Sequence, residues 1–99
     1  EMYIVRDVFK AKPGKSKLLV SIFKEASRHM INHGPRNIRV LTDVVAGFWT
    51  VIWEFEVEEV SDYLGMNKSV DEDVAVYNAL EGYKDHIVDG HREILKVED

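Results

Sequence analysis

The run FWTVIWEFEV, Phe48 to Val57, is the most β-prone stretch of the chain and decides its fold. Aromatic and β-branched residues fit a pleated, half-buried surface. Because successive side chains of a strand point to opposite faces, one face of this run is wholly apolar and the other is mixed. The apolar face holds Trp49, Val51, Trp53, Phe55 and Val57, and the mixed face holds Phe48, Thr50, Ile52, Glu54 and Glu56. We expect a strand that follows a hairpin turn near Gly47.

The segments before this strand predict another strand, a helix and the first arm of the hairpin. Residues 3–11 are rich in β-branched and aromatic side chains and end at the Pro-Gly pair 13–14, which favours a strand followed by a turn. From Lys15 onward, apolar residues recur at spacings that place them on one helical stripe. The Gly-Pro pair 34–35 ends this helix, because glycine adopts the left-handed C-terminal conformation and proline cannot continue a helix. Residues 37–45 form the first arm of the hairpin.

The segments after this strand predict a second helical region and a last strand. Residues 58–64 can form a short helix. The Ser-x-x-Glu pattern at 69–72 is a capping box, which predicts the start of a longer helix whose apolar residues keep helical spacing over 70–87. The Asp-Gly pair 89–90 then turns the chain into a last strand over 92–97.

This order of elements is the βαββαβ arrangement of the ferredoxin-like α+β fold, a four-stranded antiparallel sheet with both helices on one face. We expect residues 1–99 to form one such domain. The face of the sheet away from the helices is also apolar in part. The first strand has apolar side chains on both sides, Ile4 and Val8 on one and Tyr3, Val5 and Phe9 on the other, and the strand at 48–57 has Phe48 and Ile52 opposite its aromatic face. Leaving such side chains in water forfeits about 1.5 to 3 kcal/mol each. We therefore expect a homodimer packed through the sheet faces.

Composition narrows the possible partners and cofactors. The sequence contains no Cys, which excludes a disulfide framework, a thiolate metal site and a cysteine nucleophile. Its 18 acidic and 13 basic residues give a net charge of -5, so no nucleic acid or membrane partner is expected. No apolar stretch approaches the roughly 20 residues of a membrane span, and the first residues lack the pattern of a secretory signal. A cytoplasmic location is the default expectation.

Three segments resemble known families. They are the opening run YIVRDVFKAKPGK (3–15), the Trp-Glu-Phe run at 53–55 with the short helix that follows it, and the passage 87–97 into the last strand. These segments resemble the NIPSNAP-like and antibiotic-biosynthesis-monooxygenase-like families of the dimeric α+β barrel superfamily. The resemblance implies a homodimer whose two sheets form a barrel around a small cavity. It does not select a reaction, because these families include cofactor-free oxygenases, haem-degrading monooxygenases, isomerases and members without an assigned activity.

Polar residues on the expected strands are the first candidates for a site. Arg6, Asp7, Thr50 and Glu54 interrupt faces that are otherwise apolar, and a charge that points into a barrel must be paired or functional. Arg6 and Asp7 are adjacent, so one of them faces the barrel interior and the other faces the helices or the sheet edge. If Arg6 faces the interior opposite Glu54, the two can form a structural ion pair or bind a small anionic or phenolic ligand.

Aromatic residues and histidines supply the other candidates. Trp53 and Tyr83 either pack the core or form a pocket wall. His86 lies where haem-degrading relatives carry an iron ligand, but those relatives also have an Asn on the first strand, which this chain lacks. His91 lies at a strand edge or lines a cavity. His29 and His33 are four residues apart on the first helix, but no third ligand is within sequence reach, so no metal site is expected.

The sequence favours a small homodimeric α+β barrel protein that binds a small organic ligand in the barrel interior without a cofactor. The alternatives are a cofactor-independent or haem-degrading monooxygenase and an assembly module without a ligand, so the sequence leaves open whether the protein is an enzyme. The candidate residues for the pocket are Arg6, Asp7, Thr50, Trp53, Glu54, Tyr83, His86 and His91.

Overall fold

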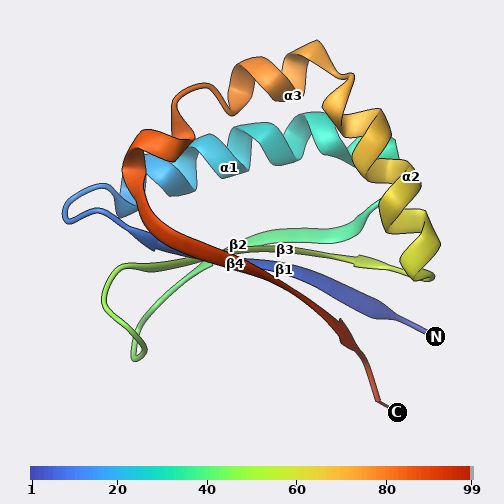
Figure 1. Cartoon of the computed structure of the whole chain (residues 1–99), viewed down its shortest axis with the longest axis horizontal. Coiled ribbons are helices and arrows are strands. Elements are labelled where there is room, and N and C mark those ends of the chain that lie inside the picture. Colours follow the sequence, from blue (N-terminus) through green and yellow to red (C-terminus); the bar gives the residue numbers. More distant parts are fainter. Residues whose placement is uncertain (99) are drawn as a thin grey trace.

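The computed structural model describes residues 1–98 as a four-stranded antiparallel sheet with helices on one face (Figure 1). The strands are β1 (Tyr3–Ala11), β2 (Arg36–Thr42), β3 (Thr50–Val57) and β4 (Ile87–Lys96), in the sheet order β2-β3-β1-β4. The helices are α1 (Ser16–Met30), α2 (Val60–Asp71) and α3 (Val74–Ala79), with two 3₁₀ turns, η1 (Ile31–His33) and η2 (Tyr83–His86). This arrangement confirms the predicted ferredoxin-like α+β fold.

The register of the central strand β1 decides which of its charged residues faces the helices. Asp7 is opposite Trp53 of β3 and Arg92 of β4, whereas Arg6 is opposite Glu54 and Glu93. Alternate residues of a strand face opposite sides. Asp7 therefore lies on the helix-covered face of the sheet and Arg6 on the open face, which settles the alternative that the sequence left open.

The core lies between the sheet and the helices and centres on aromatic contacts. Phe23 of α1 is fully buried, and its ring stacks on that of Trp53, with centroids 4.6 Å apart and planes 11° apart. The indole Nε1–H of Trp53 donates to the Ser27 hydroxyl at 2.9 Å, which in turn donates to the Phe23 carbonyl at 2.7 Å. Trp53 thus packs the sheet against α1 with its one polar atom satisfied.

The helix starts in the second half of the chain differ from the prediction. The capping box that forms is Glu59 with Asp62, not the pattern at 69–72: the Asp62 carboxylate accepts from the Glu59 amide at 3.1 Å, and α2 begins one residue after Glu59. Ser69 lies inside α2. The single helix predicted over 70–87 was also wrong, because Asp73 caps a new helix by accepting from the Ala75 and Val76 amides. No helix within residues 1–98 is long and apolar enough to cross a membrane.

The hairpin strand β3 starts later than predicted. Phe48 and Trp49 lie in the β2–β3 loop, and Trp49 has a φ of 59°, a left-handed conformation that an extended strand does not contain. The loop is closed by Thr50, whose amide donates to Asp43 Oδ1 at 2.9 Å and whose hydroxyl donates to the Gly47 carbonyl at 2.6 Å. Trp49 is therefore not part of the apolar face of β3.

The last strand begins earlier than predicted, because the Asp-Gly pair 89–90 lies inside β4 rather than in a turn. Gly90 pairs with Phe9 of β1, and the Phe9 ring occupies the space that a side chain at Gly90 needs. A Cβ built on Gly90 lies only 2.8 Å from Phe9 Cδ1. Gly90 is therefore a close-approach glycine within a strand.

Candidate functional site

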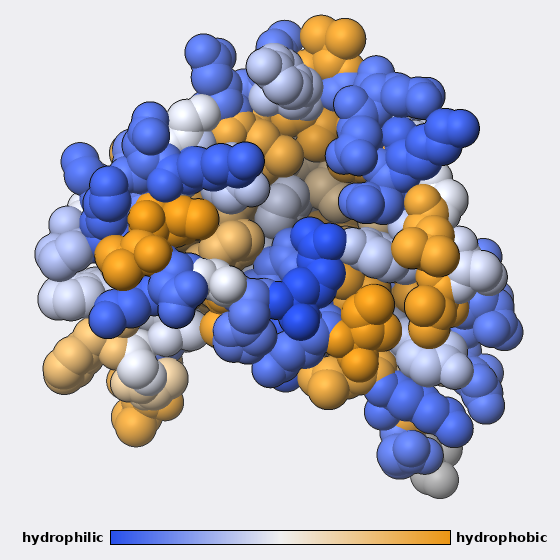
Figure 2. All heavy atoms as spheres, in the orientation of Figure 1, coloured by the Kyte–Doolittle hydropathy of each residue, from blue (hydrophilic) through white to orange (hydrophobic). Residues whose placement is uncertain are grey.

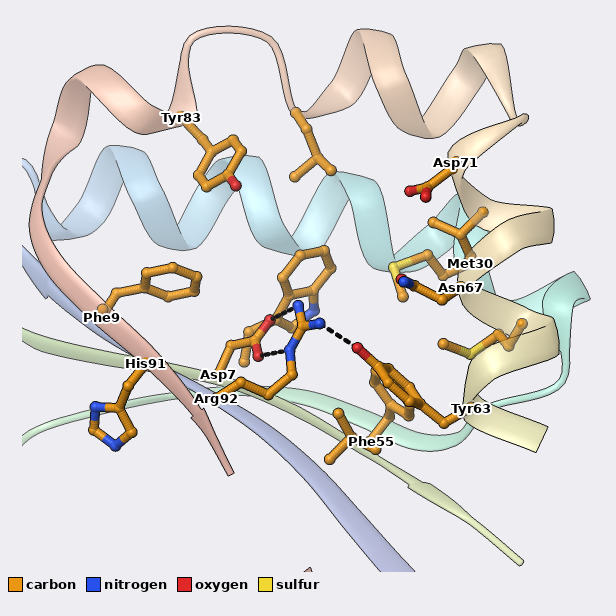
Figure 3. Close-up of a pocket in the computed structure, with 16 residues that line it drawn as sticks. Asp7, Phe9, Met30, Phe55, Tyr63, Asn67, Asp71, Tyr83, His91 and Arg92 are labelled. Carbon is orange, nitrogen blue, oxygen red and sulfur yellow. Dashed lines mark hydrogen bonds and ion pairs between the residues drawn. The ribbon is translucent and has the colours of Figure 1, made fainter. Parts of the chain in front are cut away.

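A cleft of about 370 Å³ lies between the helices and the covered face of the sheet. Its walls are mainly apolar. The sheet supplies Phe9 of β1 and Trp53 of β3, and the helical layer supplies Met30, Tyr63 and Tyr83 (Figure 3). The cleft is large enough for a small organic molecule, since ligand pockets typically have volumes of roughly 300 to 1,000 Å³.

The main polar group of the cleft is a guanidinium held by two neighbouring side chains. Arg92 of β4 donates from Nε to Asp7 Oδ1 at 2.6 Å and from Nη2 to Asp7 Oδ2 at 3.0 Å. Its Nη1 donates to the Tyr63 hydroxyl, and its guanidinium carbon lies 5.5 Å from the centroid of the Tyr63 ring. These contacts connect two strands to α2 (Figure 3). The hydrogen bonds to Asp7 raise the pKa of Arg92 above its ordinary value despite partial burial, so the group stays cationic.

The same contacts determine what Asp7 and Arg92 can do chemically. Both carboxylate oxygens of Asp7 accept hydrogen bonds from Arg92, so Asp7 is held in a bidentate ion pair and presents no uncommitted oxygen to a ligand. Arg92 uses three of the five N–H donors of an arginine within the described chain, which leaves two for a ligand or water. Asn67 and Asp71 of α2 also line the cleft (Figure 3).

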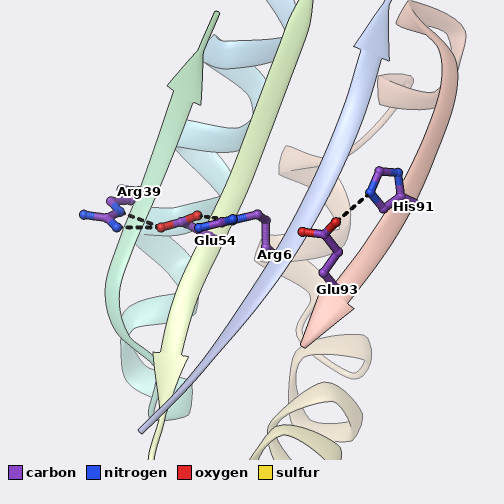
Figure 4. A network of polar contacts seen from close by, with 5 residues as sticks. All are labelled: Arg6, Arg39, Glu54, His91 and Glu93. Atoms are coloured by element: carbon purple, nitrogen blue, oxygen red, sulfur yellow. Dashed lines mark hydrogen bonds and ion pairs between the residues drawn. The ribbon is translucent and has the colours of Figure 1, made fainter. Parts of the chain in front are cut away.

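A second polar network lies on the open face of the sheet. Glu54 is only 2% exposed, and it accepts from Arg6 Nε at 2.7 Å and from Arg39 Nε at 2.8 Å (Figure 4). Burial raises the pKa of Glu54, but the hydrogen bonds from the two arginines outweigh it and bring the pKa below its ordinary value. The ion pair of Arg6 and Glu54, one of the two alternatives drawn from the sequence, is therefore present with Arg39 as a third member.

The remaining candidates lie away from the interior of the cleft. His91 borders the cleft, but its ring lies 3.1 Å from Glu93 Oε2 and points away (Figures 3 and 4). Thr50 closes the hairpin loop. His86 is in η2, where its backbone carbonyl accepts from the Lys12 amide at 2.8 Å, and it is not among the residues that line the cleft. Of the eight candidates, the structure brings together Asp7, Trp53 and Tyr83 in the cleft, and Arg6 and Glu54 on the open face.

The positions of His86 and Asp7 do not fit a haem that is ligated by His86. A haem held between the helices and the sheet needs its histidine on the cleft wall, and His86 is not on that wall. The polar first-strand residue that faces the cleft is Asp7, which is bonded to Arg92. The pair His29 and His33 is likewise divided, since His29 contacts Glu25 at 3.3 Å and His33 contacts Asp73 at 2.6 Å. Within residues 1–98, no three or more His, Cys, Asp or Glu side chains are grouped to hold a metal ion.

Sequence reasoning missed Arg92, Tyr63 and Arg39. Arg92 and Asp7 are 85 positions apart, and they meet only because β4 pairs with β1 in the register that places Arg92 opposite Asp7. Tyr63 was expected in a short helix whose orientation the sequence did not determine. An available signal was the presence of an arginine on strands that neighbour these acids: Arg6 and Arg39 on the two strands beside Glu54, and Arg92 on a strand beside Asp7.

Comparison with solved structures places this arrangement among known folds. A NIPSNAP family protein of unknown function from Agrobacterium tumefaciens superposes with a TM-score of 0.85 at 11% identity over 98% of this chain and 88% of its own. A second NIPSNAP family protein from the same organism gives 0.83 at 15% identity over 100% and 95%. An antibiotic biosynthesis monooxygenase-like protein from Chloroflexus aurantiacus gives 0.72 at 18% identity over 100% and 96%.

No family model and no curated protein matches the sequence. The likeness therefore concerns three-dimensional structure, and it extends over essentially the whole chain. This chain has the ferredoxin-like α+β fold shared by the NIPSNAP-like and antibiotic biosynthesis monooxygenase-like proteins.

Proposed function

We propose that the protein binds a small, largely apolar organic molecule in the cleft between the sheet and the helices. The observation that carries this proposal is a cleft of about 370 Å³ whose aromatic walls surround one fixed guanidinium, that of Arg92. Small-molecule sites combine such apolar walls with a few placed polar groups. The sequence placed the ligand in a barrel interior, but the cleft lies on the other, helix-covered face of the sheet.

The charges of the lining favour an uncharged ligand. Asp7 and Asp71 contribute two negative charges and Arg92 one positive charge, so the charged side chains of the lining sum to -1. An anion is therefore not favoured, whereas a neutral oxygen acceptor can take the spare N–H donors of Arg92. A ring can pack against Phe9 and Tyr83. Aromatic ketones and phenols meet both requirements, and binding is favoured over proton abstraction because Asp7 is held by Arg92.

Acetophenone, an aromatic ketone, is a direct probe of the cleft. The chain has two tryptophans, and the Trp49→Phe variant leaves Trp53 on the cleft wall as the only one. We expect saturable quenching of Trp53 fluorescence by acetophenone in this variant. In the reciprocal Trp53→Phe variant, Trp49 in the loop should show only linear, collisional quenching.

Substitutions of cleft residues distinguish binding in the cleft from binding elsewhere on the surface. In the Trp49→Phe background, Asn67→Phe fills the cleft and should abolish saturable quenching, whereas Asn78→Phe on the exposed side of α3 should not. Arg92→Met removes the donors and should weaken binding about five- to tenfold, the value of one hydrogen bond of roughly 1 kcal/mol. Equal saturable quenching in the Asn67→Phe and Asn78→Phe variants contradicts the proposed site.

We also infer that the protein is a homodimer packed through the open face of the sheet. That face carries apolar side chains that no helix covers: Ile4, Val8, Leu41, Ile52 and Leu95. The β2–β3 loop is also apolar, since Val44 and Val45 are 95% and 94% exposed. Figure 2 shows hydrophobic atoms at the lower left, where this loop lies in Figure 1. Exposed apolar surface of this extent is typical of an interface.

Size-exclusion chromatography with light scattering tests the dimer. We expect twice the chain mass of 11.4 kDa at micromolar concentration. Ile52→Asp places a charge on the open face and should shift the protein to a monomer, whereas Tyr77→Asp on the outer side of α3 should leave the dimer intact. A wild-type protein that elutes as a monomer overturns the inference.

A further inference from the structure

Outside the cleft, His33 joins two side chains that lie about 40 positions later in the sequence, Ser69 and Asp73, into a hydrogen-bonded chain. The Ser69 hydroxyl of α2 lies 2.6 Å from Nδ1 of His33 in η1. The other ring nitrogen of His33, Nε2, lies 2.6 Å from Oδ2 of Asp73, the residue that caps α3. A hydroxyl, an imidazole and a carboxylate in this order are the parts of an activated serine nucleophile.

The carboxylate of this chain is fixed in position by the backbone. Asp73 Oδ1 accepts from the Ala75 amide at 2.9 Å and from the Val76 amide at 3.4 Å, which leaves Oδ2 directed at His33. The hydrogen bond from His33 is the main reason that the pKa of Asp73 lies below its ordinary value. The tautomer with the proton on Nε2 donates to this carboxylate and presents the Nδ1 lone pair to Ser69.

An open hollow lies beside His33, the residue whose ring contacts the Ser69 hydroxyl. His33 and Gly65 both line this hollow, together with Arg36. Gly65 precedes Ser69 by one helical turn, and helical side chains lean toward the N-terminus, so the Ser69 side chain leans over Gly65. A Cβ built on Gly65 meets no atom within 4 Å. A small acyl group therefore has room beside the Ser69 hydroxyl.

We propose that Ser69 is a nucleophile that accepts the acyl group of small carboxylic esters, with His33 as its general base and Asp73 as the residue that positions His33. The Ser69 oxygen bonds to the ester carbonyl carbon while His33 Nδ1 takes the hydroxyl proton. The ester C–O bond then breaks, and the departing alcohol oxygen takes that proton from His33. Water repeats the sequence on the acyl-serine, which releases the carboxylic acid and restores Ser69.

The activated ester p-nitrophenyl acetate tests this proposal with two readouts, release of p-nitrophenolate and the mass of an acetyl group on the protein. We expect the acetyl group on Ser69 by peptide mass spectrometry. Ser69→Ala should abolish both signals above the rate in buffer. The control Ser21→Ala removes an exposed serine of α1 that does not line this hollow, and it should leave both signals unchanged.

The roles of His33 and Asp73 need variants that separate chemistry from folding. His33→Ala should lower the rate about a hundredfold, the effect of a lost general base, and added imidazole should restore part of it. Asp73→Asn keeps an acceptor for the α3 amides, so Tm should not change, while kcat falls and KM stays constant. Unchanged acetylation in Ser69→Ala, labelling on lysines alone, or a wild-type rate in His33→Ala overturns the proposal.

Discussion

Replacement of Phe23 by alanine is expected to lower the free energy of unfolding by about 3 to 5 kcal/mol. Phe23 is fully buried, and its ring contacts three others, at centroid distances of 4.6 Å from Trp53, 5.1 Å from Phe9 and 5.8 Å from Tyr83. The variant loses these contacts and leaves a cavity that the sheet and α1 cannot close. Because a domain of this size is stable by only about 5 to 15 kcal/mol, the loss is a large fraction of the total.

The Phe23→Ala variant should also weaken ligand binding, because Trp53 loses the ring that supports it at the cleft wall. Urea unfolding followed by circular dichroism gives the change in stability. The matched control is Phe48→Ala, since Phe48 is 78% exposed in the β2–β3 loop and its removal should change monomer stability little. A loss below about 1 kcal/mol for Phe23→Ala contradicts the assignment of this ring to the core.

Removal of both arginines around Glu54 is expected to have a similarly large effect. In the double variant Arg6→Met, Arg39→Met, a carboxylate that is 2% exposed loses both hydrogen-bond donors. Breaking a buried ion pair in this way costs roughly 3 to 5 kcal/mol. The triple variant that adds Glu54→Leu should recover most of this loss, because it removes the unpaired charge.

The double variant should also reverse the effect of pH on stability. In the wild type the arginines bring the pKa of Glu54 below its unfolded value, so this stabilisation is present above the ordinary glutamate pKa and is lost as pH falls through the lowered pKa. Without the arginines, burial of Glu54 is no longer opposed by their hydrogen bonds, and burial raises the pKa of Glu54. Acidification then protonates Glu54 and should increase the stability of the double variant relative to neutral pH.

Urea unfolding at several pH values between neutral and mildly acidic shows whether the free energy of unfolding rises or falls on acidification. Arg28→Met is the control, because Arg28 pairs with Glu25 on the surface, where its side chain is 70% exposed. That substitution should change stability by less than about 1 kcal/mol and should not alter the sign of the pH dependence. A double variant whose stability falls with acidification as steeply as that of the wild type is the contradicting result.

The fold could be predicted from the sequence because its signals are local. Alternation in residues 50–57, the helical stripe of α1 and the Gly-Pro stop at 34–35 each depend on neighbours in the chain. The errors fell where two local signals compete. Trp49 has the composition of a strand residue but adopts a left-handed backbone, and Gly90 reads as a turn residue but makes room for Phe9.

The site was harder to predict because its contacts are set by register. The sequence identified Asp7 and Trp53, but it could not decide between Arg6 and Asp7, since a shift of one residue exchanges the two faces of a strand. Arg92 meets Asp7 only through the pairing of β1 with β4. The contact of Ser69 with His33 joins residues 36 positions apart on two helical segments, and no spacing rule relates them.

The central claim, that the ligand binds on the helix-covered face, is tested most directly by NMR of ¹⁵N-labelled protein titrated with acetophenone. Side-chain N–H signals report on both faces of the sheet, because Trp53 and Arg92 line the cleft whereas Arg6 and Arg39 lie on the open face. We predict saturable shifts of the Trp53 Nε1–H and Arg92 Nε–H signals, with those of Arg6 and Arg39 unchanged. Shifts confined to Arg6 and Arg39, or no saturable shift at Trp53 and Arg92, would contradict the account.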